Sequence, residues 1–328
     1  MRELGFTVKE ERFDYSAFPG RLATPIAGVV LGASIVASSL LTLAGATGVA
    51  IAVLAIGVVG TSLFARWMMR DGVLTAPWLR AESRNLVAKR GAGEPRVWLV
   101  AHLDSKSQPI PSAVRVAGVT ILAAALVLAV AGILVTLAGP TSRMIEWGAM
   151  VAGVVGALPV MASVVGMRSD GAVDNASGVA AVLSAAALVS RGVSLGIMLP
   201  SAEELGLAGA RAWVRQRTGG VVLNCDGVDD DGTLVIMYNH PAPPRVLAAV
   251  QHAAHSVKSA RARRMPLGLL TDSTAFASAG WDTVTVSHGS LATLRRVHSP
   301  SDSLEHLRGT SIGVVADVLA RAAEALAK

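Results

Sequence analysis

Long stretches of this chain carry no charged residue, and their lengths predict helices that span a membrane. The uncharged stretches are residues 22–65, 116–142 and 147–167. A GATG break at residues 45–48 divides the first stretch, and GPTSR at residues 139–143 separates the other two. About 20 apolar residues cross a bilayer as a helix. The pattern therefore predicts four transmembrane helices in two hairpins, at residues 22–67 and 112–167, with buried core helices as the alternative.

The rest of the chain alternates apolar strands with helices of 10–15 residues, which is typical of a largely parallel sheet. The predicted strands are RVWLVAH, VSLGIMLP, GVVLNCD, TLVIMYN and DTVTVSH, and helical patterns stand between most of them. GFTVKEERFDYS near the start alternates like an edge strand. We therefore predict one α/β domain, a mostly parallel sheet with helices on both faces. It is assembled from an N-terminal strand segment (1–21), a second part (68–111) and a main part (168–328), with both hairpins as insertions.

Composition and charge support a membrane protein. Hydrophobic residues make up 52% of the 328 residues and charged residues 16%, against about a quarter charged in ordinary soluble domains. Both hairpins return the chain to the side where it starts, and this side holds most of the arginines that flank the predicted spans: Arg12, Arg21, Arg66, Arg70, Arg115 and Arg168. The positive-inside rule then predicts a multi-pass protein of the cell membrane with its polar domain on the cytoplasmic side.

Two further features narrow the class. The net charge of +6 accompanies these anchoring arginines, and only 4% of residues are aromatic. Because no basic stripe interleaved with aromatic residues is present, we expect no nucleic-acid partner. Cys225 is the single cysteine, which excludes an intrachain disulfide and fits a reducing compartment.

Histidines and carboxylates follow the predicted strands, at the positions where open α/β sheets place their sites. They are His102 and Asp104 after RVWLVA, Asp174 before the next helix, Glu203 and Glu204 after VSLGIMLP, Asp226 after GVVLNC, and His298 after the last strand. Each alone has a structural alternative. Ser201 and Glu204, for example, have the spacing of a helix capping box. That all of them stand at strand ends instead favours one shared site.

In combination these motifs resemble the dizinc aminopeptidase family, which includes bacterial secreted aminopeptidases, glutamate carboxypeptidase II and relatives of glutaminyl cyclase. The segments that carry the resemblance are AHLDS, GAVDNASG, SAEELG, NCDG and VHSPSDS, in the family's order. The unusual feature is the interval of 72 residues between His102 and Asp174, which the family crosses in a short loop and which here contains the second hairpin.

The resemblance implies two zinc ions and a role for each residue. His102 and Asp226 would bind one zinc, Glu204 and His298 the other, and Asp174 would bridge both. Asp104 would accept the imidazole N–H of His102 and so support catalysis. Glu203 would be the catalytic general base. Oxygen-rich sites also accept Co²⁺ or Mn²⁺.

The chain departs from the family at two positions. Val297 stands where some members have a tyrosine that could stabilise an oxyanion, and Ser273 stands where many have a histidine. Three functions stay open: an aminopeptidase, a single-zinc aminoacyl cyclase or non-peptide amide hydrolase, and an inactive membrane scaffold. Asp174 follows Arg168, at the end of the second hairpin, by only six residues. The predicted site is therefore close to the bilayer, and the predicted substrates are hydrophobic or membrane-derived peptides.

Overall fold

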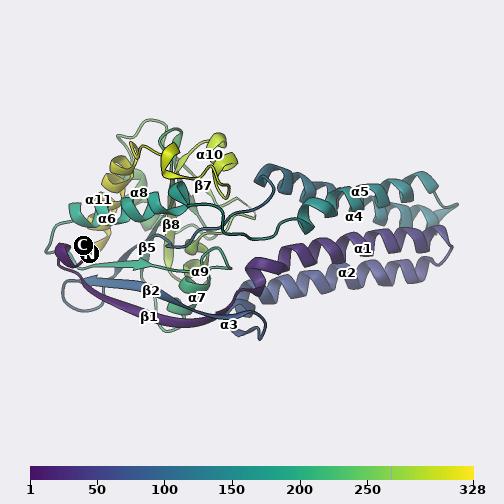
Figure 1. The fold of residues 1–328 in the computed structure, drawn as a ribbon, viewed down its shortest axis with the longest axis horizontal. Coiled ribbons are helices and arrows are strands. Elements are labelled where there is room, and N and C mark those ends of the chain that lie inside the picture. The colour runs from purple at the N-terminus through teal and green to yellow at the C-terminus, as the bar shows by residue number, and fades with distance from the viewer. Residues whose placement is uncertain (267) are drawn as a thin grey trace. The chain divides into compact units, whose positions relative to one another are not determined.

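The computed structural model describes residues 1–266 and 268–328 and divides the chain into two compact units. The sheet unit comprises residues 1–16, 79–107 and 167–328, and the helical unit comprises residues 17–78 and 108–166. Each unit is therefore built from segments that lie far apart in the sequence (Figure 1). The helical run after residue 67, where the predicted hairpin ends, continues through Met68–Gly72 and α3 (Val73–Thr75).

The sheet unit contains one eight-stranded sheet whose central strands are parallel. Its order is β1-β2-β4-β3-β5-β8-β6-β7, and β4, β3, β5 and β8 run parallel to their neighbours within this group. The strands are β1 (Thr7–Ser16), β2 (Arg80–Arg90), β3 (Val97–Val100), β4 (Leu195–Leu199), β5 (Val221–Val228), β6 (Thr233–Tyr238), β7 (Arg261–Arg264) and β8 (Asp282–Gly289). Antiparallel pairs join β1 to β2, β2 to β4, and β8 to β6.

Helices cover both faces of the sheet, which confirms the predicted fold class. On one face α6 (Gly178–Leu188), α8 (Pro244–Ala253) and α11 (Ile312–Ala327) pack over the larger core. On the other face α7 (Ala208–Val214) and α9 (Asp272–Ser278) enclose a smaller core with Trp98 and Trp213. Side chains of β3 alternate between the two cores, because successive residues of a strand point to opposite faces. All four residues of β3 are buried, as its uninterrupted apolar sequence predicts.

The edge of the sheet contains both a confirmed and a missed strand. β1 is the first strand in the sheet order, so the predicted N-terminal edge strand is confirmed. β2 pairs with β1 over ten residues and with β4 over five, and it was not predicted from the sequence. Its outer half alternates exposed charged residues with half-buried ones, so it lacks the apolar run that marks the central strands.

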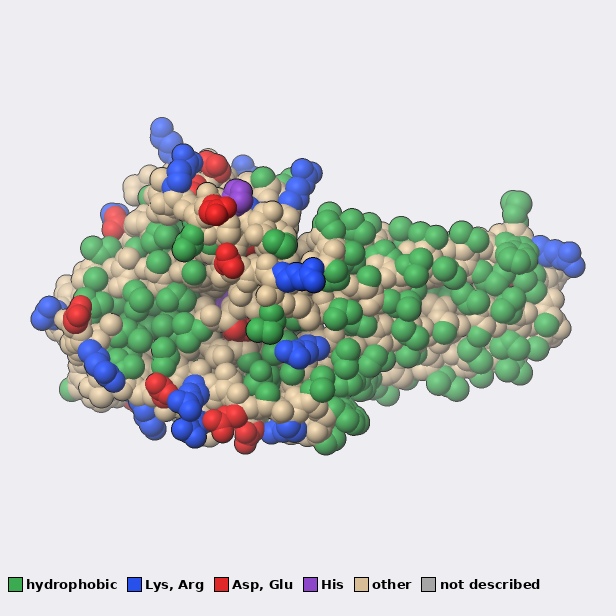
Figure 2. All heavy atoms as spheres, viewed as in Figure 1, with side chains coloured by type: hydrophobic (Ala, Val, Ile, Leu, Met, Phe, Trp, Pro, Cys, Tyr) green, Lys and Arg blue, Asp and Glu red, His purple; other side chains and the backbone are tan. Residues whose placement is uncertain are grey.

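The helical unit consists of four long apolar helices. They are α1 (Thr24–Leu43), α2 (Thr47–Trp67), α4 (Ser112–Ala138) and α5 (Arg143–Met161), and a short helical stretch at Pro19–Ala23 precedes α1. All four are long and apolar enough to cross a membrane, which indicates a membrane protein. Figure 2 shows hydrophobic side chains spread over the visible face of these helices. Small residues let the helices approach closely: a Cβ on Gly156 of α5 would lie 2.5 Å from the backbone nitrogen of Leu122 on α4.

Candidate metal centre

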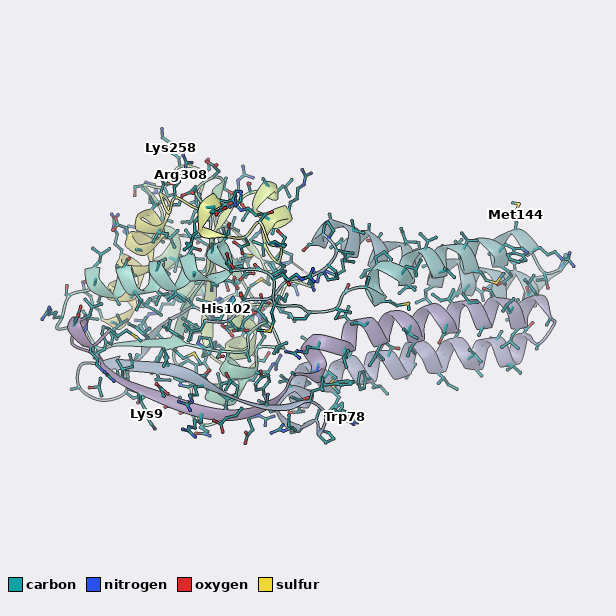
Figure 3. The ribbon with its side chains drawn as sticks, viewed as in Figure 1. Lys9, Trp78, His102, Met144, Lys258 and Arg308 are labelled. Carbon is teal, nitrogen blue, oxygen red and sulfur yellow. The ribbon has the colours of Figure 1, made fainter. Side chains whose placement is uncertain are left out.

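The predicted site residues converge at the carboxyl ends of the parallel strands. His102 follows β3, Glu203 and Glu204 follow β4, and Asp226 belongs to the last half of β5. Asp174 lies in the turn Ala172–Ser177 before α6, and His298 comes just after α10 (Leu291–Arg296). Because the strands are parallel, their carboxyl ends share one edge of the sheet, where open α/β folds place their sites. His102 is buried within the sheet unit (Figure 3).

The carboxylate of Asp174 lies between the two histidines. Its Oδ1 is 3.1 Å from Nε2 of His102, and its Oδ2 is 2.9 Å from Nε2 of His298. Nε2 of His298 is also 3.2 Å from Oε1 of Glu204, and Nε2 of His102 is 3.9 Å from Oδ1 of Asp226. Each oxygen of Asp174 therefore faces a different imidazole, the arrangement expected of a carboxylate that bridges two metal ions.

Two groups of side chains could each hold a metal ion. The His102 group consists of His102, Glu203 and Asp226, and the His298 group consists of Asp174, Glu204 and His298. Within each group the ligand atoms lie within 4.8 Å of one another. Nitrogen and oxygen donors without thiolate suit a catalytic zinc site.

Buried atoms without hydrogen-bond partners test whether a metal fits here. Among the described residues, Oδ1 of Asp174 and Oε1 of Glu204 are buried and accept no hydrogen bond. Buried polar atoms are almost always paired, so two unpaired carboxylate oxygens that face imidazole nitrogens fit metal ligands. The residues present therefore fit zinc.

The acidic cluster pushes the pKa values of its members apart. Burial raises the pKa of Glu203 well above its usual range, and the neighbouring carboxylates raise it further. Burial opposes the charged form of Asp174, but the imidazoles of His102 and His298 beside its two oxygens outweigh this effect and lower its pKa. Asp174 thus stays charged at neutral pH, whereas burial opposes the charged form of Glu203. Strong shifts in opposite directions within one buried cluster are typical of functional sites.

Asp104 holds the main chain of the glutamate pair rather than the ring of His102. The Nδ1 atom of His102 lies 2.9 Å from the backbone carbonyl of Asp104, while the Asp104 carboxylate is 3.8 Å away. That carboxylate instead accepts the backbone N–H groups of Glu203 (3.0 Å) and Glu204 (3.1 Å). The predicted bond from imidazole to carboxylate is therefore wrong. Each carboxylate oxygen of Asp104 accepts one of two consecutive backbone N–H groups after β4, and the backbone carbonyl of Asp104 contacts the imidazole of His102.

The capping-box alternative for Glu204 is wrong. Helix α7 begins at Ala208, seven residues after Ser201. The Ser201 hydroxyl instead contacts the hydroxyl of Ser83 on β2 at 2.7 Å. The backbone N–H of Glu204 is already bound to Asp104. The glutamate pair is therefore part of a loop at the strand end and not the first turn of a helix.

Three further residues belong to the site and were missed in the sequence. Nζ of Lys106 contacts Oε2 of Glu204. Burial lowers the pKa of Lys106, but Glu204 and Glu203 raise it more, so the side chain is a cation. The carboxylate of Asp302 accepts the backbone N–H groups of Val173 (2.7 Å) and Asp174 (3.2 Å).

The third missed residue is Asp272, at the start of α9. It is fully buried, neither of its carboxylate oxygens has a hydrogen-bond partner among the described residues, and burial raises its pKa to about 8. Asp272 stands in the TDSTAF segment, and Asp302 stands in VHSPSDS. Each could have been identified as a motif residue, whereas Lys106 carries no such signal.

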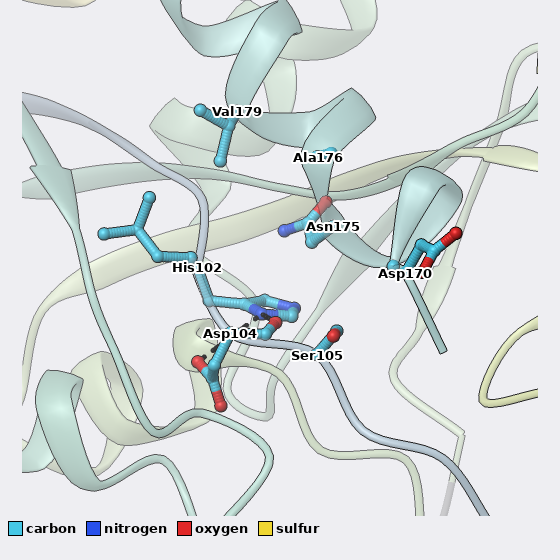
Figure 4. Close-up of a pocket in the computed structure, with 9 residues that line it drawn as sticks. His102, Asp104, Ser105, Asp170, Asn175, Ala176 and Val179 are labelled. Carbon is cyan, nitrogen blue, oxygen red and sulfur yellow. Dashed lines mark hydrogen bonds and ion pairs between the residues drawn. The ribbon is translucent and has the colours of Figure 1, made fainter. Parts of the chain in front are cut away.

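A small cavity opens beside His102. It measures about 210 Å³, and its lining includes His102, Asp104, Ser105 and Asp170. Figure 4 shows the imidazole of His102 beside Asp104 at this cavity. A second cavity of about 430 Å³ shares Asp170 with the first. The candidate site is therefore accessible to small molecules at its edge.

An α/β sheet that brings two imidazoles and several carboxylates to one strand edge defines a metalloenzyme-type site. The sequence pattern of peptidase family M28 matches residues 85–323, and the chain therefore belongs to this family. Its membership confirms the metallopeptidase family predicted from the motifs. The match to a peptidase family agrees with the predicted class of a peptidase-type hydrolase.

Solved structures with a similar fold include aminopeptidases and a cyclase. An aminopeptidase from Aneurinibacillus sp. strain AM-1 is 16% identical, with 74% of this chain and 48% of that chain covered and a TM-score of 0.49. A zinc aminopeptidase from Bacillus subtilis is 19% identical, with 75% and 50% covered and a TM-score of 0.49. Glutaminyl cyclase from Porphyromonas gingivalis is 16% identical, with 74% and 77% covered and a TM-score of 0.47.

The match to the first two structures covers only part of those chains. This chain spans about half of their length. Among proteins with curated descriptions, none shows a significant sequence match to this chain.

Proposed function

We propose that this protein is a membrane-anchored zinc aminopeptidase. The observation that carries the proposal is the Asp174 carboxylate, whose two oxygens face Nε2 of His102 and Nε2 of His298 within hydrogen-bond distance. A carboxylate shared in this way joins the His102 group and the His298 group into one centre. Family membership supports peptide bonds as the bonds that are hydrolysed.

Two zinc ions would be held by five side chains. His102 and Asp226 would bind one ion, Glu204 and His298 the other, and Asp174 both. Zinc bound there supplies Lewis-acid chemistry: it polarises a carbonyl group and lowers the pKa of a bound water. The two groups of donor atoms support a count of two.

Glu203 would move the protons of the reaction. Its side chain is 6% exposed, and it follows β4 directly before Glu204. It would take a proton from the attacking water and deliver it to the leaving amine. A carboxyl whose pKa is raised by burial holds such a proton long enough to return it. Glu203 also lies among the possible ligands of the His102 group, so metal content decides between base and ligand.

The membrane part of the proposal rests on the four apolar helices and their flanking arginines. We infer that all four helices span the cell membrane in two hairpins and that the sheet unit is on the cytoplasmic side. The catalytic domain would then act on peptides that are present in the cytoplasm or released from the membrane.

The direct test measures which substrates the full chain cleaves in detergent with added zinc. We expect release of p-nitroaniline from aminoacyl-p-nitroanilides and no release from their N-acetylated forms. Equal cleavage of free and acetylated substrates would contradict the aminopeptidase assignment. Cyclisation of N-terminal glutaminyl peptides without anilide cleavage would establish the cyclase alternative instead.

A further inference from the structure

Lys106 introduces a positive charge into the candidate metal centre. It follows β3 by six residues, on the same segment as His102, and its Nζ contacts Oε2 of Glu204. The side chain of Lys106 is 18% exposed and that of Glu204 5% exposed. Water screens such a part-buried pair less than a surface pair, so the ammonium acts on the carboxylate it touches.

The two oxygens of Glu204 are therefore engaged differently. Oε1 lies 3.2 Å from Nε2 of His298 and has no hydrogen-bond partner in the part of the chain that the structure describes, whereas Oε2 contacts Nζ of Lys106. A carboxylate has two oxygens to offer, and here one of them already has a cation. A zinc ion in the His298 group would bind the remaining oxygen while its own charge is repelled by the ammonium.

The His102 group has a different electrostatic environment. The carboxylate of Asp226 lies 3.9 Å from the imidazole of His102, which binds zinc in its neutral form and then does not repel it. Glu204 is the ligand that pairs with a lysine, whose ammonium brings a positive charge to this carboxylate. In the proposed centre both zinc positions use Asp174 as a ligand. They differ in their other carboxylate ligand, because Glu204 is paired with the ammonium of Lys106 whereas Asp226 lies beside an imidazole.

We propose that Lys106 is a positioning residue that makes the zinc affinities of the two positions unequal. This inference rests on the proposed function. Lys106 holds Glu204 by one oxygen and weakens zinc in the His298 group relative to the His102 group. When the second zinc is absent, the ammonium of Lys106 offsets part of the negative charge of the acidic cluster that the zinc would otherwise offset. The centre is thus able to stay folded with one zinc bound and to lose the second zinc readily.

Zinc affinity measured on the full chain in detergent tests this inference without any substrate. The metal-free protein is titrated with zinc against a chromophoric chelator, and bound zinc is counted by mass spectrometry. In the wild type we expect two zinc ions with separate dissociation constants. Lys106→Met should lower the second constant by about tenfold or more, the scale on which outer partners of ligands alter metal affinity. The first constant should change little.

Two variants serve as controls. Lys106→Arg keeps the cation and should stay near the wild-type second constant. Lys89→Met removes a lysine of the same unit that pairs with Glu94 on the surface, and it should alter neither constant. A second readout is thermal unfolding: Lys106→Met should gain more melting temperature from saturating zinc than the wild type. If Lys106→Met does not fold, Lys106→Gln takes its place.

The outcomes separate this inference from the proposed function. The role of Lys106 is overturned if the second zinc dissociation constant of Lys106→Met lies within threefold of the wild-type value or is higher than it. This holds even if the protein is an active peptidase. The expected shift in an enzyme that cleaves no aminoacyl substrate supports Lys106 and overturns the aminopeptidase proposal. Failure of every variant to bind a second zinc overturns the inference as well.

Discussion

At the scale of single residues, we propose different tasks for the adjacent glutamates Glu203 and Glu204. Glu204 faces His298 and Lys106, while Glu203 carries the raised pKa. We propose that Glu204 binds metal and that Glu203 acts as the base, because a carboxylate held by a metal moves protons poorly. The Asp104 carboxylate accepts the backbone N–H groups of Glu203 and Glu204, which holds the main chain that positions both side chains.

Glu203→Gln should separate the two tasks. We expect turnover to fall by about 10²- to 10⁴-fold, the usual contribution of a general base, with zinc content unchanged. Glu204→Gln should instead lower the zinc content, because it removes a ligand. Metal analysis and anilide hydrolysis on the same preparations give both values. Loss of zinc in Glu203→Gln would show that Glu203 is a ligand and not the base.

Asp302 should position the bridging ligand. Its buried carboxylate accepts two consecutive backbone N–H groups, and the second belongs to Asp174. Asp302→Asn places an amide NH₂ against one of these donors, which should cost about 1–3 kcal/mol of folding stability and reduce zinc affinity. Thermal unfolding and zinc titration measure the two effects.

Asp230 provides the matched control for Asp302. Its carboxylate likewise accepts two backbone N–H groups, from Arg308 (2.6 Å) and Thr310 (2.7 Å). Asp230→Asn should lower stability by a similar amount and leave zinc affinity unchanged. The same loss of zinc affinity in both variants would mean that general destabilisation, rather than the position of Asp174, sets metal binding.

The sequence was informative about this site where residue type and strand end coincide. His102 could be predicted because parallel strands bring their carboxyl ends to one edge, and Asp174 and His298 because they stand in the motifs GAVDNASG and VHSPSDS. The hydrogen bonds of Asp104 could not, because whether its carboxylate meets a ring or two backbone amides depends on the path of the loop after β4. Lys106 could not either, since one lysine in a loop follows no period and its contact with Glu204 exists only in three dimensions.

At the scale of elements, apolar runs explain which strands could be predicted. β3 and β4 are buried throughout and read as uninterrupted apolar segments. β7 consists of RARR, and all four residues are exposed at the end of the sheet. Charged residues are common on edge strands because they discourage pairing with other chains, and they also remove the apolar signal. β2 was missed for a similar reason.

Close packing of α4 against α5 gives an element-scale prediction. A Cβ on Gly156 would meet the backbone of Leu122 at 2.5 Å and the carbonyl oxygen of Gly118 at 2.9 Å, and backbone atoms cannot move aside cheaply. Gly156→Val should therefore destabilise the helical unit by about 1–3 kcal/mol. Thermal unfolding in detergent measures the loss.

Gly148 on the same helix is the control. A Cβ there would have its nearest neighbour, a side-chain carbon of Leu128, at 4.0 Å, which is an ordinary contact. Gly148→Val introduces the same side chain into the same helix without the clash. Equal melting temperatures for the two variants would contradict close packing of α4 and α5 at Gly156.

At the scale of the whole molecule, the distribution of arginines predicts its orientation. A reporter fused after Lys328 should be active in the cytoplasm. Tags inserted at residues 45–48 and beside Arg143 should be labelled only from outside, because these are the turns within the two predicted hairpins. An externally accessible C-terminus would overturn the cytoplasmic assignment and leave the zinc chemistry untouched.

We propose that the cluster of histidines and carboxylates at the sheet edge holds two zinc ions. X-ray absorption at the zinc edge of the full, zinc-loaded chain tests it most directly. We expect two zinc ions per chain, with only nitrogen and oxygen neighbours at about 2.0–2.2 Å and a second metal at about 3.5–4 Å. A sulfur neighbour at about 2.3 Å, which would have to come from Cys225, would contradict it. So would zinc with no metal neighbour at any loading.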